Sequence, residues 1–117
     1  MDTAARRALL LTASNPEERL DYVVTLSGQL PGGAAVTFRY VPDRLILLAQ
    51  AFARYTGAFA TRSGIEAQAA TLLADFNDVL IPRWLHVAVA AKDHHAIIED
   101  RQPRWNNTVL LQRLERI

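Results

Sequence analysis

The sequence predicts a small α+β protein in which two helices pack on one face of a four-stranded antiparallel sheet, the ββααββ order. Three observations predict this class. Two segments alternate apolar and polar residues around turn residues, as β-hairpins do. Between them, apolar residues recur every three or four positions, as on the buried face of a helix. Two strands, two helices and two strands in this order form a two-layer arrangement.

Composition limits the kind of protein. The chain has 117 residues, of which 50% are hydrophobic and 21% charged, as is typical of one globular domain. We interpret residues 1–117 as a single domain, with 1–19 as an N-terminal extension and 104–117 as a C-terminal tail. The basic residues are scattered and the formal net charge is +1, so we expect no nucleic-acid partner. The apolar runs are too short to span a bilayer, so we expect no membrane partner.

Cysteine is absent from the chain. Any chemistry of this protein therefore proceeds without a thiolate, a disulfide or a cysteine-held metal. The absence fits a reducing compartment, and no cleavage pattern follows the short apolar stretch after Arg6 and Arg7. These features predict a cytoplasmic protein.

The first hairpin is predicted within residues 20–41. Residues 20–30 are rich in β-branched side chains, Pro31-Gly32-Gly33 supplies a turn, and Val36, Phe38 and Tyr40 alternate with polar neighbours after it. Residues 14–18 have the cap, the N1 proline and the acidic first turn of a helix start. A helical turn is therefore a further possibility before the first strand.

Two helices are predicted next. From Arg44 the apolar period changes from two to three and four, which places Leu45, Leu48, Phe52, Tyr55 and Phe59 on one helical face. The chain breaks at residues 61–64, and Pro82 ends the second helix. The buried side of that helix is expected to carry Ile65, Ala69, Leu72, Leu73, Phe76, Val79 and Leu80.

The second hairpin is predicted from residue 84 onward. Residues 84–91 alternate as a strand, residues 92–94 are polar and turn-like, and residues 96–98 resume a strand. One face of the first of these strands is expected to carry Trp84, His86, Ala88 and Ala90. The tail at 105–117 fits either a helix or a strand.

Two segments carry a resemblance to a known family. Val-Thr-Phe-Arg-Tyr-Val-Pro-Asp-Arg at 36–44 and Pro-Arg-Trp-Leu-His-Val at 82–87 resemble, in this order and spacing, the tunnelling-fold (T-fold) proteins. Over about residues 25–100 the chain is most similar to the NADPH-dependent 7-cyano-7-deazaguanine reductases of queuosine biosynthesis. It is also similar to the C-terminal domain of GTP cyclohydrolase I. The resemblance implies a homo-oligomer that binds a purine- or pterin-like small molecule at a subunit interface.

The resemblance also implies that the known catalytic groups are lost. The reductase's cysteine nucleophile falls at Thr25 and its acid partner at Gly32. The Glu-Ser-Lys-Ser-Leu-Lys signature associated with the nicotinamide cofactor falls on residues 47–54, which contain no acid and no lysine. The zinc ligands of the cyclohydrolase fall at Thr25, at Gly28 and near His95. We therefore assign no metal site, and the cofactor and the catalytic residues stay unknown, with Thr25 at the position of the family's nucleophile.

Glu66 is the ligand-binding residue that the resemblance leaves in place. Gly64-Ile65-Glu66 occupies the position of the reductase's Phe-His-Glu, whose glutamate holds the purine. A carboxylate can accept two charge-assisted hydrogen bonds from the ring N–H and the exocyclic amine of a guanine-like base. The alternative is a capping box, in which Ser63 is the N-cap and Glu66 at N3 reaches back to it. Both interpretations stay open from the sequence.

Other polar residues have structural explanations beside functional ones. Thr25 as a nucleophile needs a neighbouring base, and none is recognisable. Asp93, His94 and His95 are consecutive, so on an extended chain they point to opposite faces, and a polar hairpin tip is favoured over a metal site. His86 is expected to be half-buried and to titrate near neutrality. A pocket or the core is expected to contain Tyr22, Arg39, Tyr40, Trp84 and Trp105.

Two functions remain as hypotheses, and whether the chain is an enzyme is left open. The first is a divergent tunnelling-fold protein that binds a purine- or pterin-like ligand through Glu66. The second is a non-catalytic assembly subunit, which the exposed edges of a four-stranded sheet favour independently. An active nitrile reductase is disfavoured because that chemistry proceeds through a cysteine thioimide.

Overall fold

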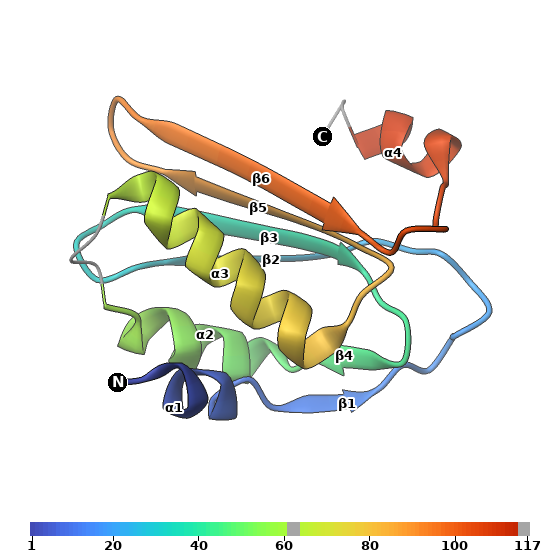
Figure 1. Ribbon diagram of the computed structural model, residues 1–117, viewed down its shortest axis with the longest axis horizontal. Coiled ribbons are helices and arrows are strands. Elements are labelled where there is room, and N and C mark those ends of the chain that lie inside the picture. The colour runs from blue at the N-terminus through green and yellow to red at the C-terminus, as the bar shows by residue number, and fades with distance from the viewer. Residues whose placement is uncertain (61–63, 115–117) are drawn as a thin grey trace.

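The main sheet has four antiparallel strands in the order β2-β3-β5-β6. The computed structural model describes residues 1–60 and 64–114. The strands are β2 (Val24–Gln29), β3 (Ala35–Val41), β5 (Trp84–Ala90) and β6 (His95–Arg101). Helices α2 (Ala49–Ala58) and α3 (Ile65–Leu80) cover one face of this sheet (Figure 1). The α+β class and the order of two strands, two helices and two strands are confirmed.

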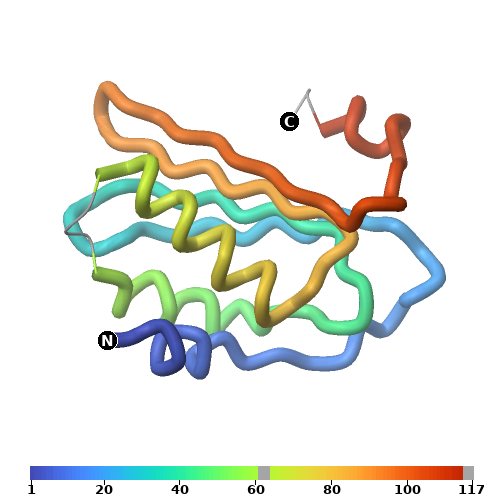
Figure 2. The backbone as a smooth tube through the Cα atoms, in the orientation of Figure 1, coloured from blue at the N-terminus to red at the C-terminus, as the bar shows by residue number. Residues whose placement is uncertain are grey.

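Four short elements lie outside that plan. They are α1 (Thr3–Ala8), β1 (Thr12–Ser14), β4 (Leu45–Leu47) and α4 (Thr108–Leu114). Strand β1 pairs antiparallel with β4, so the N-terminal segment runs beside the chain that leaves β3 (Figure 2). The predicted N-terminal extension is therefore a structured part of the domain.

One sequence prediction near these elements is wrong. The helix expected from Arg44 begins only at Ala49, because residues 45–47 pair with β1 and the N–H of Leu48 still donates to the carbonyl of Leu11 at 3.1 Å. Where a helical turn was considered, at residues 14–18, the structure has a single turn over residues 16–19 and no longer helix. The side-chain oxygen of Asn15 accepts the N–H of Glu17 at 2.9 Å, as an N-cap residue does, and the N–H of Leu20 donates to the carbonyl of Glu17 at 3.2 Å.

The core lies between the sheet and the two helices. Its centre is a group of aromatic rings, in which Phe38 of β3 stacks on Phe76 of α3 with ring centroids 4.1 Å apart. Tyr40 stacks on Phe38 with ring centroids 4.7 Å apart. The rings of Phe52 and Tyr55 on α2 lie 6.0 Å and 5.3 Å from the ring of Phe76. The alternation predicted for β3 is confirmed, since Val36, Phe38 and Tyr40 are all buried.

A buried carboxylate joins α1 to the helix layer. Asp75 of α3 is fully buried and accepts hydrogen bonds from Nε of Arg6 at 2.6 Å, from Nε of Arg7 at 2.9 Å and from the hydroxyl of Tyr55. Burial raises the pKa of Tyr55, and the bond to Asp75 raises it further. This network fastens the N-terminal helix to the core.

Helix α3 ends on a strained residue. Ile81 caps the helix with φ 45° and ψ 56°, the left-handed region that costs an L-residue about 1–2 kcal/mol, and its side chain is 64% exposed. We expect Ile81→Gly to raise the free energy of unfolding by about 0.5 to 1 kcal/mol, because the relieved strain exceeds the added entropy of the unfolded chain. Urea denaturation measures this change.

The control for that prediction is Ile97→Gly. Ile97 is as exposed as Ile81, at 68%, but it lies inside strand β6 and is not among the residues with positive φ. Glycine there is expected to destabilise. Loss of stability in both variants would contradict the assignment of strain to Ile81.

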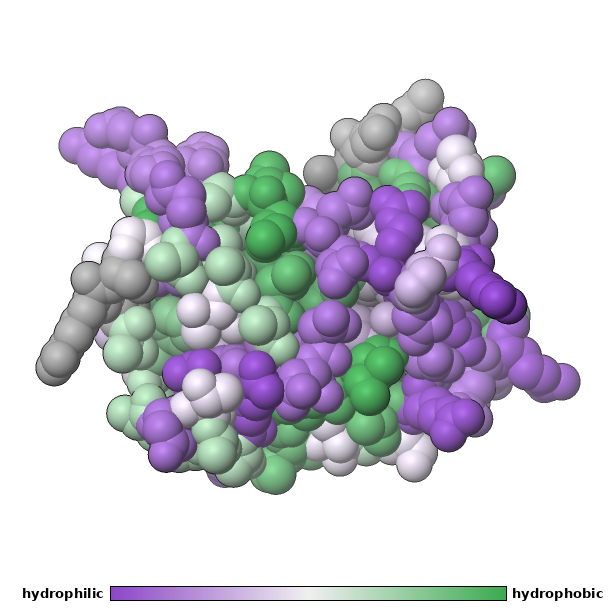
Figure 3. All heavy atoms as spheres, in the orientation of Figure 1, coloured by the Kyte–Doolittle hydropathy of each residue, from purple (hydrophilic) through white to green (hydrophobic). Residues whose placement is uncertain are grey.

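The helix side of the molecule has a mixed surface. Hydrophilic side chains gather at the β5–β6 hairpin, near α1 and toward the end that carries residues 15–23 and 101–107, and apolar atoms show between these groups (Figure 3). Within residues 1–60 and 64–114, no helix is both long and apolar enough to cross a bilayer.

Candidate functional site

Polar side chains form a row across the sheet face that α2 and α3 leave uncovered, here called the open face. Thr25 of β2 lies opposite Arg39 of β3, Arg39 lies opposite His86 of β5, and His86 lies opposite Glu99 of β6. Successive side chains of a strand point to opposite faces. Since the neighbours Phe38, Leu85 and Val87 are buried under the helices, this polar row points the other way.

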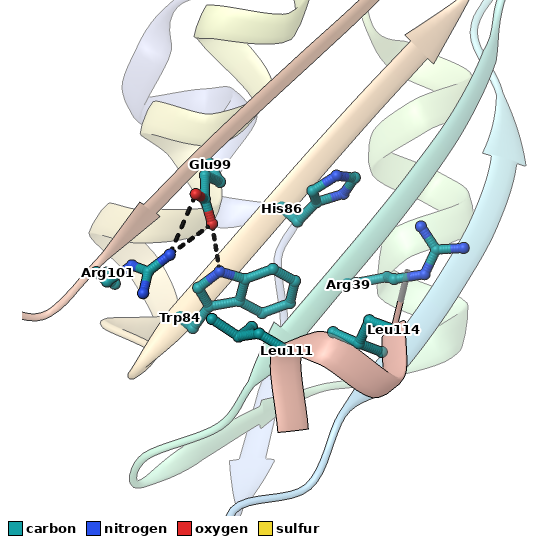
Figure 4. Close-up of a pocket in the computed structure, with 7 residues that line it drawn as sticks. All are labelled: Arg39, Trp84, His86, Glu99, Arg101, Leu111 and Leu114. Atoms are coloured by element: carbon teal, nitrogen blue, oxygen red, sulfur yellow. Dashed lines mark hydrogen bonds and ion pairs between the residues drawn. The ribbon is translucent and has the colours of Figure 1, made fainter. Parts of the chain in front are cut away.

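A pocket of about 330 Å³ lies over one end of the open face. Strands β3, β5 and β6 form its floor, and α4 forms a wall (Figure 4). Its lining combines two arginines, a histidine, a glutamate, an indole and two leucines: Arg39, Trp84, His86, Glu99, Arg101, Leu111 and Leu114.

One side of the pocket is fixed by internal bonds. Glu99 accepts Nε1–H of Trp84 at 2.5 Å, and Nη2 of Arg101 lies 3.1 Å from each of its oxygens. The indole of Trp84 and the imidazole of His86 stack with ring centroids 5.7 Å apart. The polar groups of Trp84, Glu99 and Arg101 are therefore already engaged with one another.

The other side of the pocket has unused hydrogen-bonding groups. Nε of Arg39 and Nδ1 of His86 are buried and have no hydrogen-bond partner among the described residues. Buried polar nitrogens are nearly always bonded in folded proteins. The side chains of Arg39 and His86 both line the pocket (Figure 4).

The environment keeps His86 neutral at pH 7. Burial lowers the pKa of His86 below its ordinary 6.5, and the charge of Arg39 lowers it further. The charge of Glu99 raises this pKa, but by less than burial and Arg39 together lower it. A neutral imidazole offers one donor and one acceptor nitrogen.

We expect an NMR titration to place the pKa of His86 below 6.5. Arg39→Met is expected to raise this pKa and Glu99→Gln to lower it, because the first removes a positive charge and the second a negative one. Since the folded state holds this proton less tightly than the unfolded chain, His86 lowers stability as the pH falls below 6.5. A pKa at or above 6.5 would contradict this description of the site.

The wall that α4 provides is held by Asp21. One oxygen of this carboxylate accepts Nε1–H of Trp105 and Nδ2–H of Asn107, both at 3.0 Å. The side chain of Asn107 also accepts the N–H of Leu110 at 3.1 Å, as an N-cap residue does. Within the tail that fits two patterns in the sequence, residues 108–114 are therefore a helix, and Asn107-Thr108 was the signal for its start.

The positions taken from the cyclohydrolase zinc site do not come together. Thr25 is exposed on the open face, whereas Gly28 faces α2, where an added Cβ would lie 3.2 Å from the ring of Phe52. His95 lies at the opposite end of β6 from the pocket, and among the described residues no group of three possible metal ligands exists. Gly32, with φ 99°, belongs to the turn between β2 and β3.

Thr25 has no base beside it. Its hydroxyl has no hydrogen bond within the described part of the chain, and its neighbour in the polar row is Arg39, a permanent cation. His86 is two strands away, and each strand spacing is about 4.8 Å. From this position the hydroxyl of Thr25 can donate a hydrogen bond, but no neighbouring group can accept its proton and make it a nucleophile.

Glu66 lies away from the pocket. Helix α3 begins at Ile65, with Gly64 as its N-cap. The capping box of Ser63 and Glu66 stays a prediction, because Ser63 lies outside the described residues. The carboxylate of Glu66 is 72% exposed, and its Oε2 lies 3.2 Å from Nε2 of His94 in the β5–β6 turn. A ligand contact through Glu66 stays a prediction.

The structure separates the five residues that were expected in a pocket or in the core. Tyr40 belongs to the core, where its hydroxyl accepts the N–H of Leu47 at 2.8 Å, and Tyr22 donates to Asn15. Arg39 and Trp84 do line the pocket, while Trp105 borders a separate hollow next to Arg83. Glu99 and Arg101 were not found from the sequence.

Comparison with known proteins leaves the family open. No family model matches the chain, and no curated protein matches it. Among solved structures, it is similar to the apo form of the archaeosine synthase QueF-Like, with 15% sequence identity and a TM-score of 0.43. That similarity covers 74% of this chain and 95% of the other. A likeness of this degree assigns neither a family nor an activity.

Proposed function

We propose that this chain binds a purine- or pterin-like small molecule in the pocket on the open face. The observation that carries the proposal is the adjacent pair of buried, unpartnered nitrogens, Nε of Arg39 and Nδ1 of His86. The pocket volume of about 330 Å³ is at the small end of the range for ligand sites. A flat heterocycle presents ring nitrogens and carbonyl oxygens in one plane, and these groups complement both side chains.

The shape of the lining also favours a flat ligand. A guanidinium is planar and pairs with two adjacent acceptors, as arginine does with O6 and N7 of guanine. The rings of Trp84 and His86 stack on each other beside Arg39, and Leu111 and Leu114 add apolar surface on the wall.

Glu66 is proposed as a second ligand contact, made across a subunit interface of a homo-oligomer. Within one chain its carboxylate pairs with His94 at the β5–β6 turn, far along the strands from Trp84 and Arg101 at the pocket. A contact with the same ligand therefore requires assembly. No catalytic step is proposed, because the Thr25 hydroxyl lacks a base.

Thermal-shift and calorimetric titration with guanine, 7-deazaguanine, GTP and pterin tests the proposal. We expect at least one compound to raise the melting temperature of the protein, and Arg39→Met to abolish that shift. The control is Arg54→Gln, an exposed arginine on α2 that lies outside the pocket. No shift with any compound, or a shift that Arg39→Met leaves unchanged, would contradict the function; loss in Glu66→Gln supports the second contact.

The alternative, a non-catalytic assembly subunit, is favoured by a different observation. Ile97 is 68% exposed on the open face, and strands β2 and β6 have no outer partner among the described residues. Exposed edges and apolar side chains are features of assembling sheets. Sedimentation of the wild type and of Ile97→Asp tests this function. An oligomer that Ile97→Asp dissociates, with no ligand response in either protein, would favour assembly over binding.

A further inference from the structure

We infer that the ligand of the open-face pocket carries an oxyanion, a carboxylate or a phosphate, and that Arg39 receives it. The inference rests on the proposed function and specifies its ligand class. It also gives Thr25 a role, as a neutral donor to the same oxyanion.

The charges of the pocket are unbalanced. Arg101 is matched by Glu99, which holds it through two contacts of 3.1 Å. Arg39 has no acidic partner among the described residues, and the other lining residues are a neutral His86, an indole and two leucines. Two arginines against one glutamate leave one positive charge. An anionic group on the ligand supplies the missing charge.

The position of Glu99 shows where an oxyanion fits. Glu99 repels a ligand anion on the β6 side of the pocket, so the anion is favoured on the β3 side, next to Arg39. There the flanking residues of the polar row are Thr25 on β2 and His86 on β5, both directly opposite Arg39 in the strand register. Nδ1 of His86 has no partner within the described part of the chain, and Thr25 is exposed on the open face.

These three groups form a suitable set of donors. A guanidinium binds carboxylates and phosphates through paired N–H bonds, which are charge-assisted and stronger than neutral ones. A hydroxyl and an imidazole N–H on the neighbouring strands, each about 4.8 Å away along the sheet, add neutral donors on either side. The leucines of α4 keep water from one wall of the pocket, which strengthens the attraction between Arg39 and the anion.

Matched ligand pairs test the inference by isothermal titration calorimetry. The pairs are pterin with pterin-6-carboxylic acid and guanosine with guanosine 5′-monophosphate; inorganic phosphate and acetate are titrated alone. We expect one acidic member to bind at least tenfold more tightly than its neutral partner. The acid preference should disappear in Arg39→Met, fall a few-fold in Thr25→Val and persist in Arg54→Gln. Circular dichroism confirms that each variant is folded.

The outcomes separate this inference from the proposed function. Equal affinity for the acidic and neutral members, or an acid preference that survives Arg39→Met, would overturn the oxyanion while leaving the heterocycle site intact. Binding of phosphate or acetate that depends on Arg39, with no heterocycle bound, would support the oxyanion and overturn the proposed function. An acid preference seen only in the pterin pair identifies the anion as a carboxylate, and one seen only in the guanosine pair identifies it as a phosphate.

Discussion

Replacement of Asp75 by asparagine is expected to lower the free energy of unfolding by about 3 kcal/mol at pH 7. The carboxylate is fully buried and accepts bonds from Arg6, Arg7 and Tyr55, so its loss leaves two cations without their shared partner. Breaking a buried ion pair costs about 3–5 kcal/mol. The lower end applies here because both guanidiniums are partly exposed and can turn toward water. Urea denaturation measures the change.

The control and the pH dependence make that prediction specific. Asp78 also pairs with Arg7, at 3.0 Å, but its side chain is 60% exposed, so Asp78→Asn should cost less than about 1 kcal/mol. Burial by itself raises the pKa of Asp75, yet the bonds from Arg6, Tyr55 and Arg7 leave this pKa below its ordinary value. Asp75 thus stabilises the fold above its unfolded pKa of 3.8, and this contribution is lost as the pH falls through the lower folded pKa. Equal losses in the two variants would contradict this account.

The sequence was sufficient for the parts of the fold that follow a regular period. Strand β3 alternates strictly, and its inward residues Val36, Phe38 and Tyr40 are buried as predicted. Helix α3 has its predicted face and ends before Pro82. These signals are local, because the buried side of one element is written into its own spacing.

What the sequence did not predict depends on contacts between distant segments. Residues 45–47 have an apolar spacing that fits the following helix, and only pairing with β1 makes them a strand. Asp75 lies within a helical pattern in which nothing marks it as buried, since its partners Arg6 and Arg7 are 69 and 68 residues away. A tertiary contact overrides local preference in both cases.

The sequence predicted only part of the candidate site, because only some of its residues follow a local period. Alternation placed Trp84 and His86 on one strand face, and Arg39 was named as a possible ligand contact. Glu99 and Arg101 escaped because the prediction ended β6 at residue 98, whereas it continues to Arg101. Register then brings Glu99 opposite His86 and Arg101 opposite Trp84, and α4 closes the pocket. The polar row is a property of the assembled sheet.

Phe38→Ala is expected to lower the free energy of unfolding by about 3–5 kcal/mol, the usual cost of removing a buried aromatic side chain. Phe38 is fully buried and stacks on Tyr40 and Phe76, so the cavity opens between the sheet and both helices. Because small domains are stable by only about 5–15 kcal/mol, this variant should unfold at far lower urea concentrations. A loss below about 1 kcal/mol would mean that the rings do not carry the core.

Arg39 adjoins Phe38 in the chain and provides the matched comparison, since the two side chains point to opposite faces of β3. Arg39→Met keeps an unbranched apolar stem and removes a charge without an ion-pair partner among the described residues, so unfolding in urea should be unchanged or occur at a slightly higher concentration. The same variant should lose the ligand. Phe38→Ala should bind normally while it remains folded. Two adjacent residues with opposite effects on stability and binding would show that the helix-covered face of the sheet maintains the fold while the open face carries the function.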